Sequence, residues 1–372
     1  MPEATPAPGA RLEAAVQDPE LCAGLLRRLE AALDGANLRF MEVCGTHTVS
    51  IFQSGLRSLL PGSVTHLSGP GCPVCVTHDA EVATMLDLAG RSGVIFATFG
   101  DLLRVPGPNG RSLKHAKASG ARVEIVYSPL DAVRLAAKNP DATVVFAGVG
   151  FETTAPTVAA SVLAARAQGL ANFCVLSLHK LVPPALRALA DDPECTVEAF
   201  LLPGHVATVI GLPPFRFLAR DHQVPAAVGG FAPADILLAL CRMAEMRRDG
   251  APEIVNAYPR AVNDDGNPRA RALMDEVFLP ADALWRGLGR IPESGLALRP
   301  ELADFDAAAR FGIELAETPP IRGCRCGAVL RGRITPRECP LFGKTCTPAS
   351  PVGPCMVSTE GSCAAYFKYA AH

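Results

Sequence analysis

Seven short apolar runs, separated by segments of helical periodicity, constrain the fold of this chain more than any other feature. The runs are rich in aliphatic and β-branched residues, which is typical of strands buried on both faces of a sheet. Alternation of such strands with helices predicts parallel sheets joined by right-handed crossovers. The expected strands are Leu38–Val43, Val64–Ser68, Val94–Phe99, Val123–Tyr127, Thr143–Val149, Phe173–Leu178 and Val197–Leu202.

The same alternation sets the expected division of the chain. Seven strands fit one sheet or two smaller ones, and we favour two smaller Rossmann-like α/β domains followed by a mainly helical, cysteine-rich domain. Asp18 and Pro19 predict the start of the first helix, because Asp caps helices and Pro suits the first turn. The expected regions are an N-terminal arm and helix at 1–36 that pack on the third domain, a first α/β domain at 37–128, a second at 129–204, and the third domain at 205–372.

Composition and charge argue against several classes of protein. The 372 residues are 49% hydrophobic and 19% charged, with a formal net charge of −2, so the chain is globular and has no basic face for nucleic acid or anionic lipid. The N-terminal residues have no apolar secretion segment, and no apolar stretch approaches the ~20 residues of a membrane helix. We therefore expect a cytoplasmic protein with neither nucleic acid nor a membrane as its partner.

Three cysteines follow the first two expected strands, each just before an expected helix. Cys44 ends the first run and is followed by His47, which is close enough to polarise the thiol or share a metal. The amino end of a helix favours a thiolate, so we expect Cys44 to ionise easily. A buried, inert cysteine beside a surface histidine is an equally weighted alternative.

Cys72 and Cys75 form a CxxC motif in a stiff turn that contains two glycines and two prolines. This spacing is typical of dithiol redox sites that follow a strand. Half of a zinc site is the alternative, but the chain lacks a second CxxC to complete a zinc ribbon. We favour redox or transient metal chemistry over a purely structural role.

Further polar residues follow the later strands. Glu152 lies in the turn GVGFETTAP, which loosely resembles a phosphate-binding turn but lacks the Walker lysine and the full GxGxxG spacing. Glu152 is a candidate acid, base or ligand-orienting group, although a structural turn is the safer interpretation of the pattern. His179, Lys180 and His205 also follow expected strands and are weaker candidates for the same cleft.

The strongest signal is a cluster of cysteines near the C-terminus, among the 13 of the chain. An odd total without a secretion signal argues against a disulfide framework. Four thiolates suit a [4Fe–4S] cluster, whereas zinc knuckles usually pair cysteines about two to four residues apart. The spacing therefore favours an iron–sulfur domain, with two sulfurs to spare. The cysteines are Cys324, Cys326, Cys339, Cys346, Cys355 and Cys363.

Taken together, these motifs resemble the HypD family of [NiFe]-hydrogenase maturation proteins. No single motif is enough to identify the family, but their combination and order along the chain are highly specific. They span most of the chain from Phe40 to Tyr366. They are CGTHT at 44–48, GPGCPVC at 69–75, FATFGDLLRVPG at 96–107, GFETTAP at 150–156, PGH at 203–205 and the terminal run CPLFGKTCTP…PVGPCMVSTEGSCAAYF.

The resemblance implies a scaffold that assembles the Fe(CN)2CO unit together with a HypC-like chaperone. It also implies a HypE-like cyanide donor, supplied upstream by HypF, and indirectly the hydrogenase large subunit as a recipient. By matching motif, Cys44 would hold the transient iron, His47 would assist, and Cys72 and Cys75 would be the redox pair. The [4Fe–4S] ligands would be Cys324, Cys339, Cys346 and Cys363.

Two other functions remain open at this stage. The first is an iron–sulfur-dependent protein disulfide reductase that acts through Cys72 and Cys75 without a HypC-like partner. The second is a binding module with structural zinc at its C-terminus. Whether the chain is itself an enzyme is left open, since a maturation scaffold combines redox and ligand-transfer chemistry.

Overall fold

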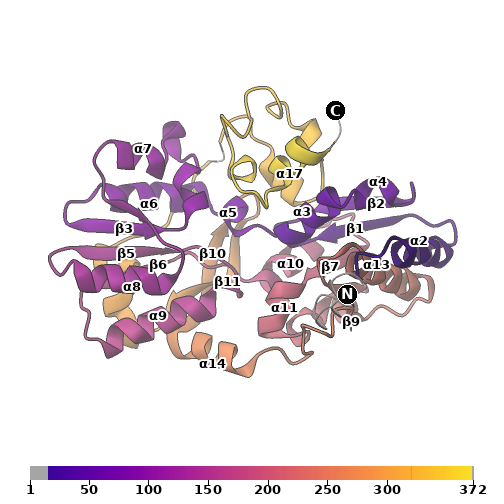
Figure 1. Ribbon diagram of the computed structural model, residues 1–372, viewed down its shortest axis with the longest axis horizontal. Helices are drawn as coiled ribbons and strands as arrows, with labels where there is room; N and C mark the ends of the chain where they lie inside the picture. The colour runs from indigo at the N-terminus through magenta and orange to yellow at the C-terminus, as the bar shows by residue number, and fades with distance from the viewer. Residues whose placement is uncertain (1–15, 320, 371–372) are drawn as a thin grey trace, which may run out of the picture.

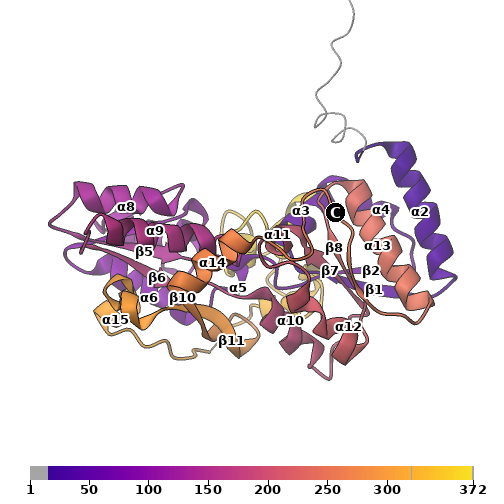
Figure 2. The same cartoon turned by 90° about the horizontal axis from the view of Figure 1, so that it is seen from below.

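Two parallel β-sheets lie at opposite sides of the molecule, and the C-terminal segment lies above the junction between them (Figure 1). The computed structural model describes residues 16–319 and 321–370. Residues 1–15 of the expected N-terminal arm lie outside the described residues. Seen from below (Figure 2), the sheet with α8 and α9 occupies one end of the molecule, and the sheet with α2 and α13 occupies the other.

The first sheet has five parallel strands in the order β2-β1-β7-β8-β9. Its central strand β7 pairs with β1, where Met41 lies opposite Phe200, and with β8 on its other side. The strand bounds are β1 Leu38–Glu42, β2 Val64–Ser68, β7 Ala199–Pro203, β8 Ala226–Gly229 and β9 Ile254–Asn256.

The second sheet has four parallel strands in the order β4-β3-β5-β6. Helix α6 packs against β3, and α8 packs against β5. A two-stranded antiparallel ribbon, β10 and β11, extends from near this sheet toward the middle of the molecule. The strand bounds are β3 Val94–Thr98, β4 Val123–Ile125, β5 Thr143–Gly148, β6 Phe173–Ser177, β10 Phe278–Trp285 and β11 Gly289–Leu298.

Helices follow almost every parallel strand, as the alternation of the sequence predicts. The α-helices are α2 Pro19–Leu33, α3 Gly45–Gln53, α4 Leu56–Leu59, α5 Pro73–Val76, α6 Asp79–Gly90, α7 Leu113–Ala118, α8 Pro129–Lys138, α9 Ala155–Ala167, α10 Val182–Ala190, α11 Gly204–Ile210, α12 Phe217–His222, α13 Pro233–Arg248, α14 Pro268–Val277, α15 Ala307–Phe311, α16 Cys326–Leu330 and α17 Ser362–Tyr369. None of the helices in the described part of the chain is both long and apolar enough to cross a bilayer.

All seven expected strands are confirmed, with their ends within two residues of the expected positions. The strands are nevertheless divided between the sheets in a different way. The first sheet takes β1 and β2 from the N-terminal side of residue 129 and β7 from the other side. The expected boundary near residue 129 therefore does not separate the sheets, because apolar runs reveal strands but not which strands pair.

The chain after residue 205 is less helical than we expected. It completes the first sheet with β8 and β9 and then forms the β10–β11 ribbon. The sequence signal for these strands was weak. Strand β8 is a short run of four mostly small residues, and the ribbon contains prolines and a bulge near Ala281. No strand lies after Leu298 among the described residues, where the chain forms α15, α16, α17 and short 3-10 turns.

The first sheet is buried on both faces, and its outer face is covered by α2 and α13. Asp18 caps α2 by accepting the N–H of Glu20 at 2.8 Å, which confirms the expected start of this helix. Leu29 of α2 and Leu237 of α13 pack in one apolar cluster with Phe40 of β1. Burial of this side chain layer fixes β1, and with it the position of the loop that follows it.

Candidate functional site

The carboxyl ends of strands from both sheets line one cleft of about 430 Å³. Residues that directly follow β1, β2, β3, β5 and β7 contribute to its wall, and so does the C-terminal segment. Parallel strands place their carboxyl ends at one edge, which is why motifs far apart in the sequence meet here. The lining includes Cys44, Gly71, Gly100, Gly150, Thr153, His205 and Glu360.

Cys44 lies at the cleft because two loops touch backbone to backbone. The N–H of Gly45 donates to the carbonyl of Gly71 at 2.9 Å. A methyl group at position 71 would overlap the backbone of Val43 and Cys44, so only glycine permits this approach. The first cysteine loop and the CxxC turn are therefore fixed against each other, as the sequence motifs lead one to expect.

The Cys44 thiol is at the N-cap of α3, and backbone N–H groups of Thr46 and His47 point at it. These groups act to lower its pKa, as expected for a helix terminus. Burial of the thiol raises its pKa by more than these N–H groups lower it, and the nearby carboxylates of Glu42 and Glu360 raise it further. The pKa of Cys44 therefore rises to about 12. The expectation of an easily ionised thiol is wrong for the unliganded protein, because desolvation dominates.

Glu42, which the sequence did not single out, lies fully buried beneath Cys44. Its carboxylate accepts the N–H of Cys44 at 3.0 Å and the hydroxyl of Thr48 at 2.5 Å. His66 of β2 places its Nε2 3.7 Å from the same carboxylate. A charged residue at the end of an apolar strand was the signal that could have identified it.

His47 does not face the cleft, although its sequence position is close to Cys44. Its ring is fully buried, and Nε2 lies 2.9 Å from the carbonyl oxygen of Gly230 beyond β8. The ring centroid of Phe231 lies 4.6 Å from that of His47, at a tilt, and Phe231 stacks on His205 with 4.1 Å between the centroids. Burial lowers the pKa of His47 to about 4, so the ring is neutral and supports the wall behind the cleft.

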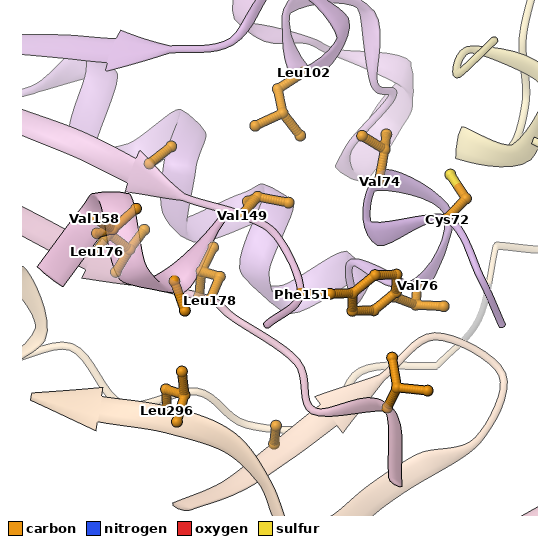
Figure 3. Close-up of a cluster of buried hydrophobic side chains, with 14 of the residues drawn as sticks. Cys72, Val74, Val76, Leu102, Val149, Phe151, Val158, Leu176, Leu178 and Leu296 are labelled. Atoms are coloured by element: carbon orange, nitrogen blue, oxygen red, sulfur yellow. The ribbon is translucent and has the colours of Figure 1, made fainter. Parts of the chain in front are cut away.

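Cys72 and Cys75 form a disulfide at the start of α5, with 5.2 Å between their Cα atoms. The side chains are only 3% and 1% exposed, and the cleft is lined by their neighbours Gly71, Pro73 and Val74. In Figure 3 the Cys72 side chain lies on the side of α5 that faces the C-terminal segment. The disulfide thus lies between the cleft and the C-terminal cysteines.

Glu152 is buried but points away from the cleft. One carboxylate oxygen accepts the N–H of Val182 at 2.8 Å, at the start of α10, and the other has no hydrogen-bond partner among the described residues. Burial raises the pKa of Glu152 to about 7. The neighbours Gly150, Phe151 and Thr153 line the cleft in its place, so the GFETT turn contributes backbone and hydroxyl groups rather than this carboxyl.

His179 and Lys180 follow β6 but also lie behind the cleft wall. Lys180 forms a buried ion pair with Glu81 of α6, and its backbone N–H donates to Gly150 at 2.9 Å. His179 packs on Phe278 of the ribbon, and burial lowers its pKa to about 3. Of the three weaker candidates, only His205 lines the cleft.

All six C-terminal cysteines line a second, small cavity. Val329, Leu341, Phe342 and Met356 fill the space around the sulfurs, so the surroundings are apolar. Among residues 16–319 and 321–370, no group of three or more His, Cys, Asp or Glu side chains is arranged to hold a single metal ion. The cysteines of the cavity are Cys324, Cys326, Cys339, Cys346, Cys355 and Cys363.

The disulfide turn and the cysteine cavity are in contact. Helix α5 packs on the 3-10 turn Pro354–Met356, which carries Cys355 of the cavity. Arg286, in the turn of the β10–β11 ribbon, interacts with both sites. Its Nε donates to the carbonyl of Thr77, just after α5, at 2.9 Å, and its charge lies near Cys326 of the cavity. Sequence reasoning missed Arg286, because nothing near position 286 resembles a motif.

The C-terminal segment also closes the cleft over α3. Thr46 donates its hydroxyl to Glu360 at 3.0 Å, and Tyr366 of α17 packs on Phe52 of α3. Burial raises the pKa of Glu360. The cysteine-bearing segment therefore supplies one wall of the cleft as well as the second cavity.

Comparison with known proteins gives the same assignment over nearly the whole chain. The family described as HypD, the hydrogenase formation hypA family, matches residues 20–370. The chain is 44% identical to the hydrogenase maturation factor HypD of Rhodobacter capsulatus, over 95% of this chain and 96% of the relative. It is 45% identical to HypD of Escherichia coli strain K12, over 89% of each chain. By both measures, this chain belongs to the HypD family of hydrogenase maturation factors.

Proposed function

We propose that this chain is the scaffold on which the Fe(CN)2CO unit of a [NiFe]-hydrogenase is assembled. The iron unit is its cargo, held by the thiolate of Cys44 together with a cysteine of a HypC-like partner. The observation that carries this proposal is the single cleft at which Cys44, the CxxC turn and the GFETT turn meet. Low-spin iron with cyanide and CO ligands favours a soft thiolate, and binding to iron offsets the burial that keeps the free thiol protonated.

The C-terminal cysteines fit a resident [4Fe–4S] cluster. A cluster needs four thiolates on four separate irons rather than four that converge on one ion, and an apolar cavity with six thiols offers this donor set. We assign the ligands to Cys324, Cys339, Cys346 and Cys363. When bound, the cluster supplies electrons one at a time.

Cys72 and Cys75 supply the two-electron chemistry. As two thiols become a disulfide, they release two electrons and two protons, and the S–C bond of a thiocyanate-type donor breaks to release cyanide and a thiol. A HypE-like protein, fed by a HypF-like one, would present this donor at the cleft. The exposed side chains of Thr153 and His205 at the cleft leave room for such an approach from solvent.

Infrared spectroscopy of the complex with a HypC-like partner, purified without oxygen, tests the role of Cys44. Replacing Cys44 by Ala should abolish the cyanide and CO bands. Cys174→Ala is the matched control, because Cys174 is equally buried but lies in β6, away from the cleft. Cyanide bands of full strength in Cys44→Ala would show that another residue holds the iron.

Iron and sulfide analysis of the same preparation tests the cluster. A brown protein with about four irons and four sulfides is expected. Replacing Cys339 and Cys346 together by Ser should remove the colour, whereas Cys195→Ser, outside the cavity, should not. A colourless wild-type protein that contains zinc would overturn the assignment and favour a structural zinc site.

Contact between the disulfide turn and the cysteine cavity also favours a second candidate, an iron–sulfur-dependent protein disulfide reductase. Cys72 and Cys75 are only 3% and 1% exposed, so a bulky protein disulfide has less access to them than a small thiocyanate-type group presented at the cleft beside Pro73 and Val74. Turnover of a generic protein disulfide without a HypC-like partner would favour the reductase over the scaffold.

A further inference from the structure

A basic pocket leads from the surface to the C-terminal cysteines. It measures about 250 Å³ and shares Cys324 and Cys326 with the six-cysteine cavity. Its other polar lining consists of arginines, namely Arg286, Arg325, Arg331 and Arg333. Cys324 and Cys326 therefore border a pocket whose other polar side chains are all arginines.

The charge around this pocket is concentrated in one segment. Residues 321–337 contain five arginines and no acidic residue, in a chain whose formal net charge is −2. Arg333 is neutralised by Asp192 and Glu194, and Arg286 by Asp79. Arg322 and Arg325 remain as exposed arginines of the segment that have no acidic partner among the described residues.

Arg322 and Arg325 are the most available of these charges. Both side chains are exposed, and neither forms an ion pair with an acidic side chain within the part of the chain that the structure describes. Arg325 lies between two cysteines of the cavity, and Arg322 two residues before the first of them. Arg325 lines the pocket, and Arg322 directly follows Ile321, which also lines it.

The proposed chemistry requires an external reductant at this place. Each reduction of the Cys72–Cys75 disulfide breaks one S–S bond and takes up two electrons and two protons, so two one-electron donors are oxidised. An electron donor gains rate from a short path and from opposite charge at its docking face.

We propose that the arginine-rimmed pocket is the docking face for a small acidic electron-carrier protein, with Arg322 and Arg325 as its principal charges. This inference rests on the proposed function and adds the partner that supplies its electrons. A carrier with an acidic rim around its redox centre complements the pocket in charge. An extended polyanion is a poorer match, because Asp192 and Glu194 flank the arginines and interrupt the positive surface.

The test measures binding of an oxidised acidic [2Fe–2S] ferredoxin, as the probe, to the cluster-loaded protein by calorimetry without oxygen. Charge reversal in R322E/R325E should weaken binding and raise the dissociation constant at least tenfold. The matched control is R269E/R271E, which removes the same charge from two exposed arginines of α14, on the opposite side of the molecule from the C-terminal segment (Figure 1). The control should change the constant less than threefold.

Salt and competing ligands complete the test. Raising the ionic strength from about 0.01 M to about 0.15 M should weaken wild-type binding and reduce its difference from R322E/R325E. Equal binding by wild type, R322E/R325E and the control would overturn the docking face. Tighter binding of duplex DNA or of anionic vesicles at the same arginines would overturn it in favour of a polyanion site. A wild-type protein without iron and sulfide would instead overturn the proposed cluster.

Discussion

Arg286 and Asp79 form a buried bidentate ion pair, although 207 residues separate them in the chain. The Nη1 of Arg286 lies 3.0 Å from one carboxylate oxygen of Asp79, and Nη2 lies 2.5 Å from the other. The pair joins the ribbon turn to the start of α6, directly after the disulfide helix α5. It thereby fixes the disulfide turn relative to the cysteine cavity.

Replacing Arg286 by Met should destabilise the protein by about 3 kcal/mol, because it leaves the buried carboxylate of Asp79 without its partner. The double variant R286M/D79N should recover much of this loss, since removing both charges leaves neither unpaired. Urea unfolding followed by circular dichroism measures both. Arg290→Met, at an exposed position of the same ribbon, should cost less than about 0.5 kcal/mol, and an equal loss there would contradict the role of Arg286.

Gly71→Ala should destabilise the protein by about 3 kcal/mol and disturb the cleft. The added methyl group would overlap the backbone of Val43 and Cys44, and backbone atoms have little freedom to move away. Gly62→Ala is the control, because a methyl group at position 62 meets no atom within 4 Å. Thermal unfolding and the alkylation rate of Cys44 report the two effects, and wild-type values for Gly71→Ala would contradict the contact.

Glu42→Ala should lower the free energy of unfolding by about 2 kcal/mol, because the buried N–H of Cys44 and the hydroxyl of Thr48 both lose their acceptor. Glu42→Gln retains one carbonyl oxygen for the N–H of Cys44 and should cost less. Infrared spectra of the loaded complex should show the cyanide bands retained in Glu42→Gln and weakened in Glu42→Ala. Identical behaviour of the two variants would argue against positioning of Cys44 by this carboxylate.

Glu152 should make stability depend on pH. Its pKa rises from 4.5 to about 7 on folding, so the folded state holds its proton where the unfolded chain has lost it. The stability contributed by the protonated group is complete below about pH 4.5 and falls by roughly 3 kcal/mol as the pH rises to about 7. Glu152→Gln does not titrate, so its urea midpoint should lose this slope. A wild-type slope in the variant would assign the effect to other groups.

The strands and the start of the first helix were predictable because their signals are local. Each apolar run, and the Asp18-Pro19 start of α2, depends on neighbouring residues, and the structure confirms them to within two residues. Pairing of β1 with β7 rather than β3 was not predictable, since apolar strands carry no mark of their partner. The grouping of strands was therefore the weakest part of the prediction.

The sequence by itself determined which residues are able to do chemistry. Cys44, Cys72, Cys75 and the C-terminal cysteines stand out by residue type and spacing, and their placement at strand ends predicts a shared cleft. The cleft is present, with Cys44 in its lining, and the six late cysteines do share a cavity. Residue type carries this information because thiol reactivity depends on the sulfur itself.

Only the tertiary structure decided which neighbouring groups face these sulfurs and how they act. His47 and Glu152 belong to the right motifs but turn away from the cleft. Glu42 and Arg286 instead reach the sulfur sites from positions that no motif marks. The physical reason is that burial and charge act through space. Packing around the folded loop has a larger effect on the pKa of Cys44 than the helix N-terminus that the sequence predicts next to it.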